Sequence, residues 1–229
     1  MKLEKILLKK EILKGWKAAT PVALGYIPLG LAFGIMAAQQ GLTWVDVFFL
    51  SLLVYAGSAQ FIASAMIAAN ASAIAIIGTT FLVNLRHMLM SASLSPLLKH
   101  LSTGSLALIS LEITDETYAA GYPEASTGKA SKWFYFALNN LAHGSWIACT
   151  VLGCLLGNSI SDPQKWGLDF ALPAMFIGLI FTQLKGKSDI LVSLAAGILS
   201  VVLVFLLKDN FNIIVATVLA ATLGAWLDK

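Results

Sequence analysis

The feature that most constrains this chain is a charged residue inside a long apolar run. Arg86, the only arginine, lies near the middle of an apolar run at 71–94. A run of this length can cross a bilayer, which takes about 20 residues of helix. A guanidinium cannot shed its proton, so it needs acceptors or water there. Arg86 is either paired for assembly, or snorkels to an interface, or belongs to a polar site around which the other helices are arranged. We favour the site, because charges inside membrane segments are functional by default.

Composition extends this interpretation to the whole chain. Of the 229 residues, 58% are hydrophobic and 12% are charged, whereas soluble domains carry about 25% charged residues. The apolar residues form spans rather than alternations, which predicts an all-α polytopic protein of the inner (plasma) membrane. No hydrophilic segment is long enough to fold alone. We therefore expect a basic cytoplasmic lead at 1–17 and a single transmembrane domain at 18–229.

About eight segments are predicted to cross the membrane, or seven if the short segment 104–118 is left out. The eight are 18–39, 44–67, 71–94, 104–118, 133–157, 167–184, 190–207 and 211–227. The lysines favour eight crossings with both termini in the cytoplasm, because this arrangement concentrates positive charge inside. It leaves only Lys99, Lys165 and Lys208 outside.

One or two of these helices are expected to be broken. Pro21 and Pro28 predict a kinked or partly unwound helix at 18–39. The string AGSAQF at 56–61 puts small and polar residues in the middle of another span. A break there would create a half-helix amino terminus, whose free N–H groups and positive dipole end suit a carboxylate. The alternative is a small-residue packing face with Gln60 bonded to a neighbour.

Acidic residues in the segment 104–118 offer a counter-charge for Arg86. Glu112 lies three residues before Asp115 and four before Glu116, so on one helix the three acids would share a face. They belong either to an interfacial helix end in water or to a pair with Arg86. We favour the pair, with Asp115 as the first candidate.

Other motifs concern packing. Asn139, His143 and Trp146 form a polar stripe on the helix expected at 133–157, and we expect His143 to be a structural hydrogen bonder. The GxxxG motifs at 30–34 and 153–157 let helix backbones approach closely, so both need a surface to pack against. The string GLAF at 30–33 is similar to GLIF at 178–181, which leaves an inverted repeat open.

The sequence motifs that would indicate several other classes of function are absent from this sequence. Cys149 and Cys154 lie on different sides of one helix, so neither a disulfide nor a metal site is expected. The chain has no HExxH, no GxSxG and no pair of aspartates within its spans, so we expect no enzyme, no catalytic residue and no cofactor. The lysines cluster in the lead and loops, which gives no sign of a nucleic-acid partner. The alternatives to a carrier are an ion or small-solute channel and a non-transporting assembly subunit. A channel would not explain opposite charges in neighbouring spans, and a purely structural subunit would not maintain an arginine inside the membrane.

Five strings together resemble the AzlC family, the large subunit of branched-chain amino-acid exporters. They are PLGLAFG at 28–34, AGSAQF at 56–61, NLRH at 84–87, TDE at 114–116 and GCLLG at 153–157, with Trp146 nearby. The resemblance covers roughly residues 18–160. It implies that the domain at 18–229 exports leucine, isoleucine, valine and related apolar amino acids such as methionine. It also implies a small membrane subunit of the AzlD type as partner. Export against a gradient additionally needs a coupling ion, so we expect the transport to be ion-coupled.

An amino acid is a zwitterion with an apolar tail, which predicts a site with three parts. The carboxylate suits Arg86 or the N–H groups near Gly57 and Ser58, and the ammonium suits acidic or amide oxygens. Phe61, Phe81 and Met90 would line a cavity for the aliphatic side chain, and His87, Asp115 and Glu116 would bind a coupling proton. The expected substrate-binding residues are Gly57, Ser58, Gln60, Asn84, Arg86, His87, Asp115 and Glu116.

Overall fold

The computed structural model describes residues 2–157, 159–160, 165, 167–170, 173–174, 177–178, 180–181, 184, 186–206 and 211–227, which contain helices and turns but no strand. The chain divides into two compact units, Met1–Leu172 and Pro173–Lys229. Four helices of the described part are long and apolar enough to cross a membrane, at Lys5–Gln39, Ala73–Leu97, Lys132–Gly157 and Lys187–Val204. The prediction of an all-helical membrane protein is confirmed, whereas the count of eight crossings is not.

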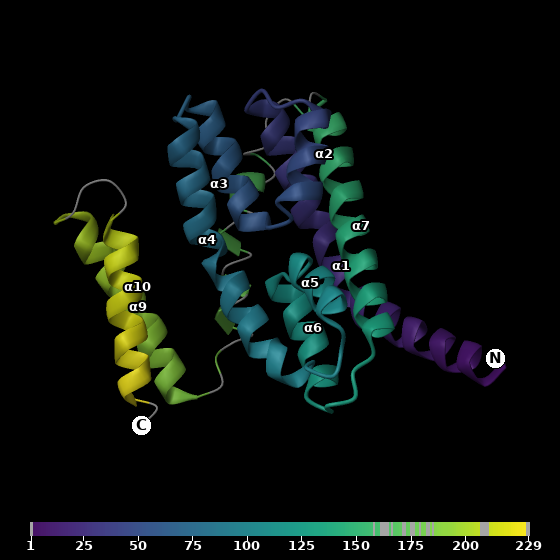
Figure 1. The fold of residues 1–229 in the computed structure, drawn as a ribbon. Helices are drawn as coiled ribbons and strands as arrows, with labels where there is room; N and C mark the ends of the chain where they lie inside the picture. The colour runs from purple at the N-terminus through teal and green to yellow at the C-terminus, as the bar shows by residue number, and fades with distance from the viewer. Residues whose placement is uncertain are drawn as a thin grey trace. The chain divides into compact units, whose positions relative to one another are not determined.

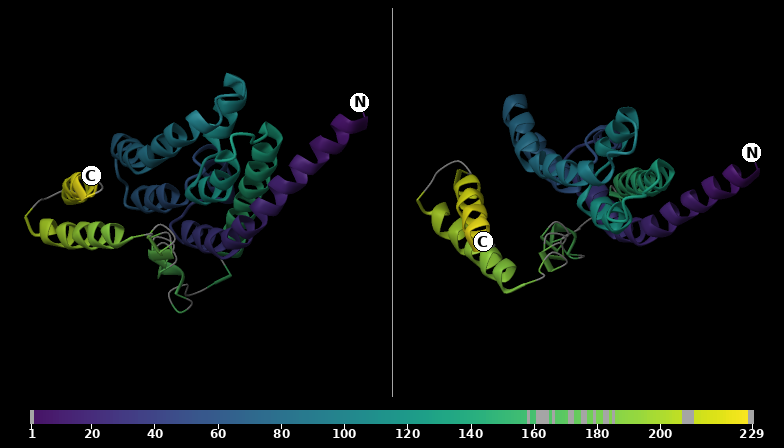
Figure 2. Two further views of the ribbon diagram at one scale, coloured as in Figure 1. Left: turned by 90° about the horizontal axis from the view of Figure 1, so that it is seen from below. Right: turned by 60° about the horizontal axis from the view of Figure 1, so that its bottom comes forward.

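Three long helices frame the first unit (Figure 1): α1 (Lys2–Gln39), α4 (Ala73–Leu94) and α7 (Lys132–Gly157). A short 3-10 turn, η1 (Ser95–Leu97), extends α4. The expected unwinding of the first span is wrong, because α1 runs unbroken through Pro21 and Pro28. The helix also includes the basic lead, whose first turns extend beyond the other helices of this unit (Figure 2).

Helices α1 and α7 run parallel and touch along most of their length. Gly15 lies against Phe134, Gly34 against Thr150 and Gly157 against Ala38, so the register advances in the same direction on both helices. A Cβ atom added at Gly34 would collide with the carbonyl oxygen of Thr150. The two GxxxG motifs therefore pack on each other's helix within one chain, as small residues allow, and they do not call for a second protein.

The segment 44–67 forms a helical hairpin rather than one broken crossing helix. It contains α2 (Trp44–Leu53) and α3 (Gly57–Ala68), of 10 and 12 residues. Helix α3 returns to the starting point of α2, because Ile67 lines the same hollow as Gly41 and Asp46. At about 1.5 Å per residue, each arm reaches about halfway through a hydrocarbon core of about 30 Å. The break expected near Gly57 is confirmed, and the crossing is corrected to a hairpin.

The segment expected as one helix at 104–118 is a second hairpin, which enters from the opposite end. Its arms are α5 (Thr103–Leu111) and α6 (Asp115–Ala125). Helix α6 runs antiparallel to α1, because Glu116 contacts Tyr26 whereas Glu124 pairs with Lys14. The break at 112–114 separates Glu112 from the other two acids, so the predicted single acidic face is wrong.

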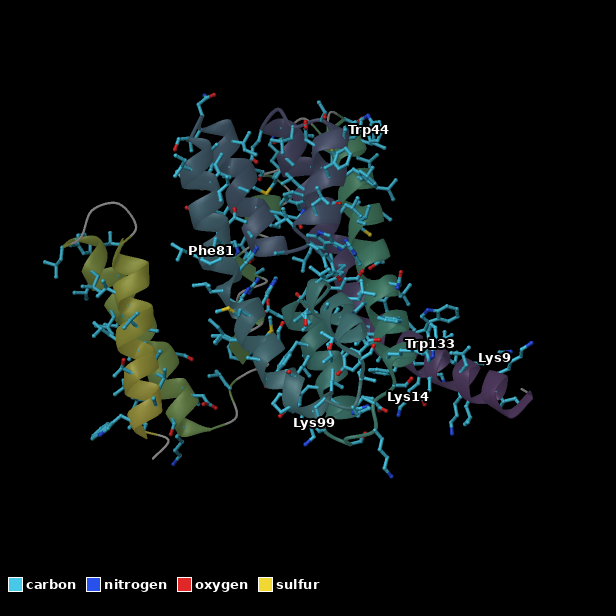
Figure 3. The ribbon with its side chains drawn as sticks, viewed as in Figure 1. Lys9, Lys14, Trp44, Phe81, Lys99 and Trp133 are labelled. Atoms are coloured by element: carbon cyan, nitrogen blue, oxygen red, sulfur yellow. The ribbon has the colours of Figure 1, made fainter. Side chains whose placement is uncertain are left out.

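Because both hairpins return to the end from which they enter, α1, α4 and α7 are the described helices that connect the two ends of the first unit. Figure 3 shows Lys14, Lys99 and Trp133 at one end and Trp44 at the other. The expectation that Lys99 lies on the side opposite to the basic lead is therefore wrong. The reason is that 44–67 is a hairpin and not a crossing helix, so α4 runs back toward the end where α1 begins.

The second unit contains α9 (Lys187–Val204) and α10 (Phe211–Leu227), which pack against each other. Gly224 of α10 lies close to Val192 of α9, where the glycine leaves room for the valine side chain. The turn η3 (Leu168–Phe170) belongs to the first unit. Much of the span expected at 167–184, including part of the string at 178–181, lies outside the described residues, so the inverted repeat stays a prediction.

Candidate functional site

The amino terminus of α3 lies at the tip of the first hairpin, where Ala56 and Ser58 are buried. Its capping residue is Ala56, which has no side-chain oxygen for the first-turn N–H groups of Gly57 and Ser58. Tyr55, the residue before it, has φ 39°, a left-handed conformation that is uncommon for a residue other than glycine. This tip therefore presents open N–H groups and the positive end of a helix dipole.

The tip of the second hairpin is capped and acidic instead. Thr114 and Thr117 form a reciprocal capping box, with N–H to Oγ distances of 3.2 and 2.8 Å. Asp115 and Glu116 occupy the first turn of α6, where negative charge complements the helix dipole. The two tips thus offer opposite electrostatic environments.

Arg86 of α4 joins the two tips. Its Nη1 lies 2.6 Å from Oδ2 of Asp115, and its Nη2 donates a hydrogen bond of 2.7 Å to Oγ of Ser58. Only 27% of the Arg86 side chain and 15% of the Asp115 side chain are exposed, so the pair is largely shielded. The expected Arg86–Asp115 pair is confirmed, and Ser58 belongs to the same cluster.

Several buried polar atoms around this bridge have no hydrogen-bond partner among the described residues. They are Oδ1 of Asn84, Nε of Arg86, Nε2 of His87 and the hydroxyl of Tyr55. Three of them lie within one turn of α4, and Tyr55 lies at the adjoining hairpin tip. Leaving such a group unpaired costs about 1–3 kcal/mol, so these atoms are suited to a polar ligand.

The three acids contact three different helices. Asp115 pairs with Arg86 of α4. Glu116 accepts a hydrogen bond of 2.9 Å from the hydroxyl of Tyr26 on α1, and Glu112 lies 3.6 Å from Nδ1 of His143 on α7. The second hairpin is therefore held by each of the long helices through a separate polar contact.

Gln60 is engaged within the protein at both ends of its amide. Trp146 donates to its Oε1 at 2.9 Å, and its Nε2 donates to Ser51 at 3.0 Å. Ser51 in turn bonds Thr150 at 2.8 Å, and Gln60 is fully buried. This geometry favours the alternative reading of Gln60 as a group bonded to its neighbours.

The three apolar residues expected to line one cavity do not come together. Phe61 packs its ring on Phe33, with centroids 5.2 Å apart. Met90 packs against a separate buried cluster that includes Leu94. Phe81 is 65% exposed and points outward from α4 (Figure 3). The expectation of a common Phe61–Phe81–Met90 cavity is therefore wrong.

Sequence reasoning missed Tyr26 and Tyr55 as parts of this region. Tyr26 bonds Glu116 and, at 2.7 Å, Thr114. Tyr55 stacks on His143, with ring centroids 4.0 Å apart. The position of Tyr55 directly before the string AGSAQF was an available signal, because a polar aromatic residue at a helix break inside a membrane needs a partner.

Comparisons with known proteins show what this chain is similar to. The family model described as AzlC protein matches residues 21–160, more than half of the chain. A membrane protein of Helicobacter pylori is 31% identical over 91% of this chain and 93% of its own length. Inner membrane protein YgaZ of Escherichia coli is 29% identical, over 80% of this chain and 77% of its own. The branched-chain amino acid transport protein AzlC of Bacillus subtilis is 28% identical, over 71% and 64%. No solved structure matches.

Proposed function

Because this chain belongs to the AzlC family of membrane transport proteins, we propose that it exports branched-chain or related apolar amino acids through the site around Arg86. The observation that carries this proposal is the bridge from Arg86 to the tips of two opposing hairpins. A group that joins both tips is suited to a carrier, because substrate bound there can alter the contact between them. The Bacillus subtilis relative is a branched-chain amino acid transport protein, which supports the substrate class.

A zwitterion fits between Arg86 and Asp115 without leaving either charge unpaired. Its carboxylate replaces Asp115 at the guanidinium and reaches the N–H groups of Gly57 and Ser58, while its ammonium takes Asp115 or Oδ1 of Asn84 as acceptor. Removing one partner of a buried pair costs about 3–5 kcal/mol. Inserting a molecule of both charges avoids that cost, whereas a simple anion or cation does not.

Export against a gradient needs a driving ion, and protons are part of this proposal. His87, Asp115 and Glu116 are the carriers expected from the sequence. Asp115 faces a guanidinium that keeps its proton, and Glu116 accepts from Tyr26. The ring nitrogen Nε2 of His87, by contrast, has no hydrogen-bond partner among the described residues.

A small AzlD-type membrane subunit belongs to the same proposal, on the family resemblance. The GxxxG motifs give it no support, because they pack within this chain. We expect expression of this chain alone to give little export and co-expression of an AzlD-like protein to restore it. Full export from the purified chain in liposomes would exclude an obligatory partner.

Counterflow in proteoliposomes tests the transport function directly. Vesicles loaded with unlabelled leucine should accumulate external labelled leucine for a time, and isoleucine and valine should compete. The variant Arg86→Leu, reconstituted in equal amount, serves as the control without the guanidinium. An ion channel or an assembly subunit would give no transient accumulation, and that result in the presence of the partner subunit would contradict the proposal.

A further inference from the structure

His143 of α7 is a second residue that touches both hairpins. Its Nε2 lies 3.0 Å from the carbonyl oxygen of Ser51 in α2, and its Nδ1 lies 3.6 Å from Oε1 of Glu112 at the end of α5. Its ring stacks on Tyr55 at the tip of the first hairpin. Only 13% of the His143 side chain is exposed.

The contacts of His143 fix where its protons can be. A backbone carbonyl only accepts hydrogen bonds, so Nε2 must carry a hydrogen to bond Ser51. The other nitrogen, Nδ1, then faces the carboxyl group of Glu112. If His143 were neutral and Glu112 ionised, the lone pair of Nδ1 would point at the negatively charged carboxylate, which is unfavourable. The arrangement is therefore favourable only when one further proton is held, either on Nδ1 of His143 or on Glu112.

We propose that His143 and Glu112 together hold the proton that is exchanged for the amino acid, an inference that rests on the proposed transport function. The proton binds from water on one side of the membrane while the tip of the second hairpin meets α7. When that tip moves away, Glu112 leaves His143 and the proton passes to water on the other side. Only an N–H or O–H bond forms and breaks in each direction.

This placement separates the coupling ion from the substrate. The substrate part lies on α4, with Arg86 and Asp115, whereas the proton part lies on α7. Both parts bridge the same two hairpins, so one movement of the hairpins alters both. By contrast, Nε2 of His87 has no partner among the described residues, so no hydrogen bond of that nitrogen ties its proton to the position of a hairpin.

The titratable groups that face this pair come from two other elements. Tyr55 stacks on His143 from the first hairpin, and Tyr26 of α1 packs edge-on against Trp146, three residues further along α7, at 5.0 Å. Behind Tyr26 lies Glu116, its hydrogen-bond acceptor. Tyrosine hydroxyls are uncharged at neutral pH, so neither tyrosine adds a charge beside His143 and Glu112.

The test combines leucine transport with a pH-sensitive dye inside proteoliposomes. In the wild-type protein, leucine movement should drive proton movement, and a pH gradient should drive leucine accumulation. Glu112→Gln and His143→Gln should abolish both proton signals. Glu124→Gln is the matched control, because Glu124 pairs with Lys14 at the end of the unit, and it should behave like the wild type.

The outcomes separate this inference from the proposed function. Wild-type protein that shows no leucine counterflow when reconstituted with the partner subunit contradicts the proposed function itself. Counterflow without any proton movement, or normal proton movement in Glu112→Gln, overturns the His143–Glu112 assignment and leaves the transport function standing.

A measurement on the wild-type protein keeps the test valid if the variants do not fold. The chain has three histidines, so protein labelled with ¹⁵N-histidine gives few ring signals. His87→Gln and His100→Gln identify two of them, and the remaining signal belongs to His143. Addition of leucine should change the protonation of that ring, and an unchanged His143 signal in protein that binds leucine would overturn the inference.

Discussion

Arg86 uses two edges of one guanidinium for two different hairpins. Nη1 contacts Asp115 and Nη2 contacts Ser58. A planar fork with five donors allows this, whereas a lysine ammonium is a compact point charge. The sequence predicted the pair with Asp115 from charge balance alone. It could not predict Ser58 as the second partner, because that contact depends on the hairpin that brings α3 beside α4.

Replacing Arg86 tests the fork. Arg86→Lys keeps the charge but reaches one tip only, so the protein should fold while the apparent leucine affinity in counterflow falls about 10- to 100-fold. This estimate corresponds to the loss of a charged hydrogen bond of about 1.5–3 kcal/mol. Arg86→Leu leaves Asp115 uncompensated, at about 3–5 kcal/mol, and should lower the yield of folded protein. Wild-type affinity in Arg86→Lys would contradict a role for the fork.

A charge swap separates folding from transport. The double variant Arg86→Asp, Asp115→Arg restores balance without restoring geometry, so it should recover yield more than counterflow. Asp115→Asn alone should reduce both, because the guanidinium loses its anionic partner. Wild-type yield and transport in Asp115→Asn would show that Asp115 is not the counter-charge that matters.

At the scale of elements, the breaks were easier to predict than the path of the chain around them. The string AGSAQF indicated a half-helix at Gly57, and α3 begins there. Crossing helices and hairpins share the same apolar composition, so hydropathy could not distinguish them. The second break could also have been predicted, because Thr114 and Thr117 have the spacing of a capping box. It was missed because the three acids were assigned to one helical face.

Glycines of α1 give a prediction at the same scale, with a control on the same helix. Gly34→Ala adds a methyl group where the carbonyl oxygen of Thr150 lies, and overpacking of this kind costs about 1–3 kcal/mol. The methyl group of Gly25→Ala meets nothing within 4 Å and improves helix propensity, so the stability of this variant should match or exceed that of the wild type. Thermal unfolding in detergent checks both, and equal midpoints for the two variants would contradict close packing of α1 on α7.

At the scale of the whole molecule, six membrane crossings account for the positions of the lysines as well as eight do. With two hairpins in the first unit, Lys99 joins the basic lead at one end. If the three apolar segments after α7 cross as expected, six crossings keep both termini in the cytoplasm and leave Lys165 and Lys208 outside. The lysine count does not distinguish the two schemes, because removing two crossings leaves the later loops on the same side of the membrane.

Cysteine labelling distinguishes six crossings from eight. On a background with Cys149 and Cys154 replaced by alanine, exposed cysteines are introduced at Ala69, Lys99 and Ser126. An impermeant thiol reagent added outside intact cells should label Ala69→Cys and spare Lys99→Cys. Ser126→Cys is the control, since both schemes place it inside. Outside labelling of Lys99→Cys with protection of Ala69→Cys would restore the eight-crossing scheme.

The most direct measurement for the site itself is a structure of the protein in nanodiscs with leucine bound. We expect the leucine carboxylate within hydrogen-bond distance of Arg86 and of the N–H groups of Gly57 or Ser58, with its ammonium toward Asp115. The 2.6 Å contact between Arg86 and Asp115 should open to admit it. Leucine bound elsewhere, with the Arg86–Asp115 contact intact, would contradict a substrate site between the two hairpins.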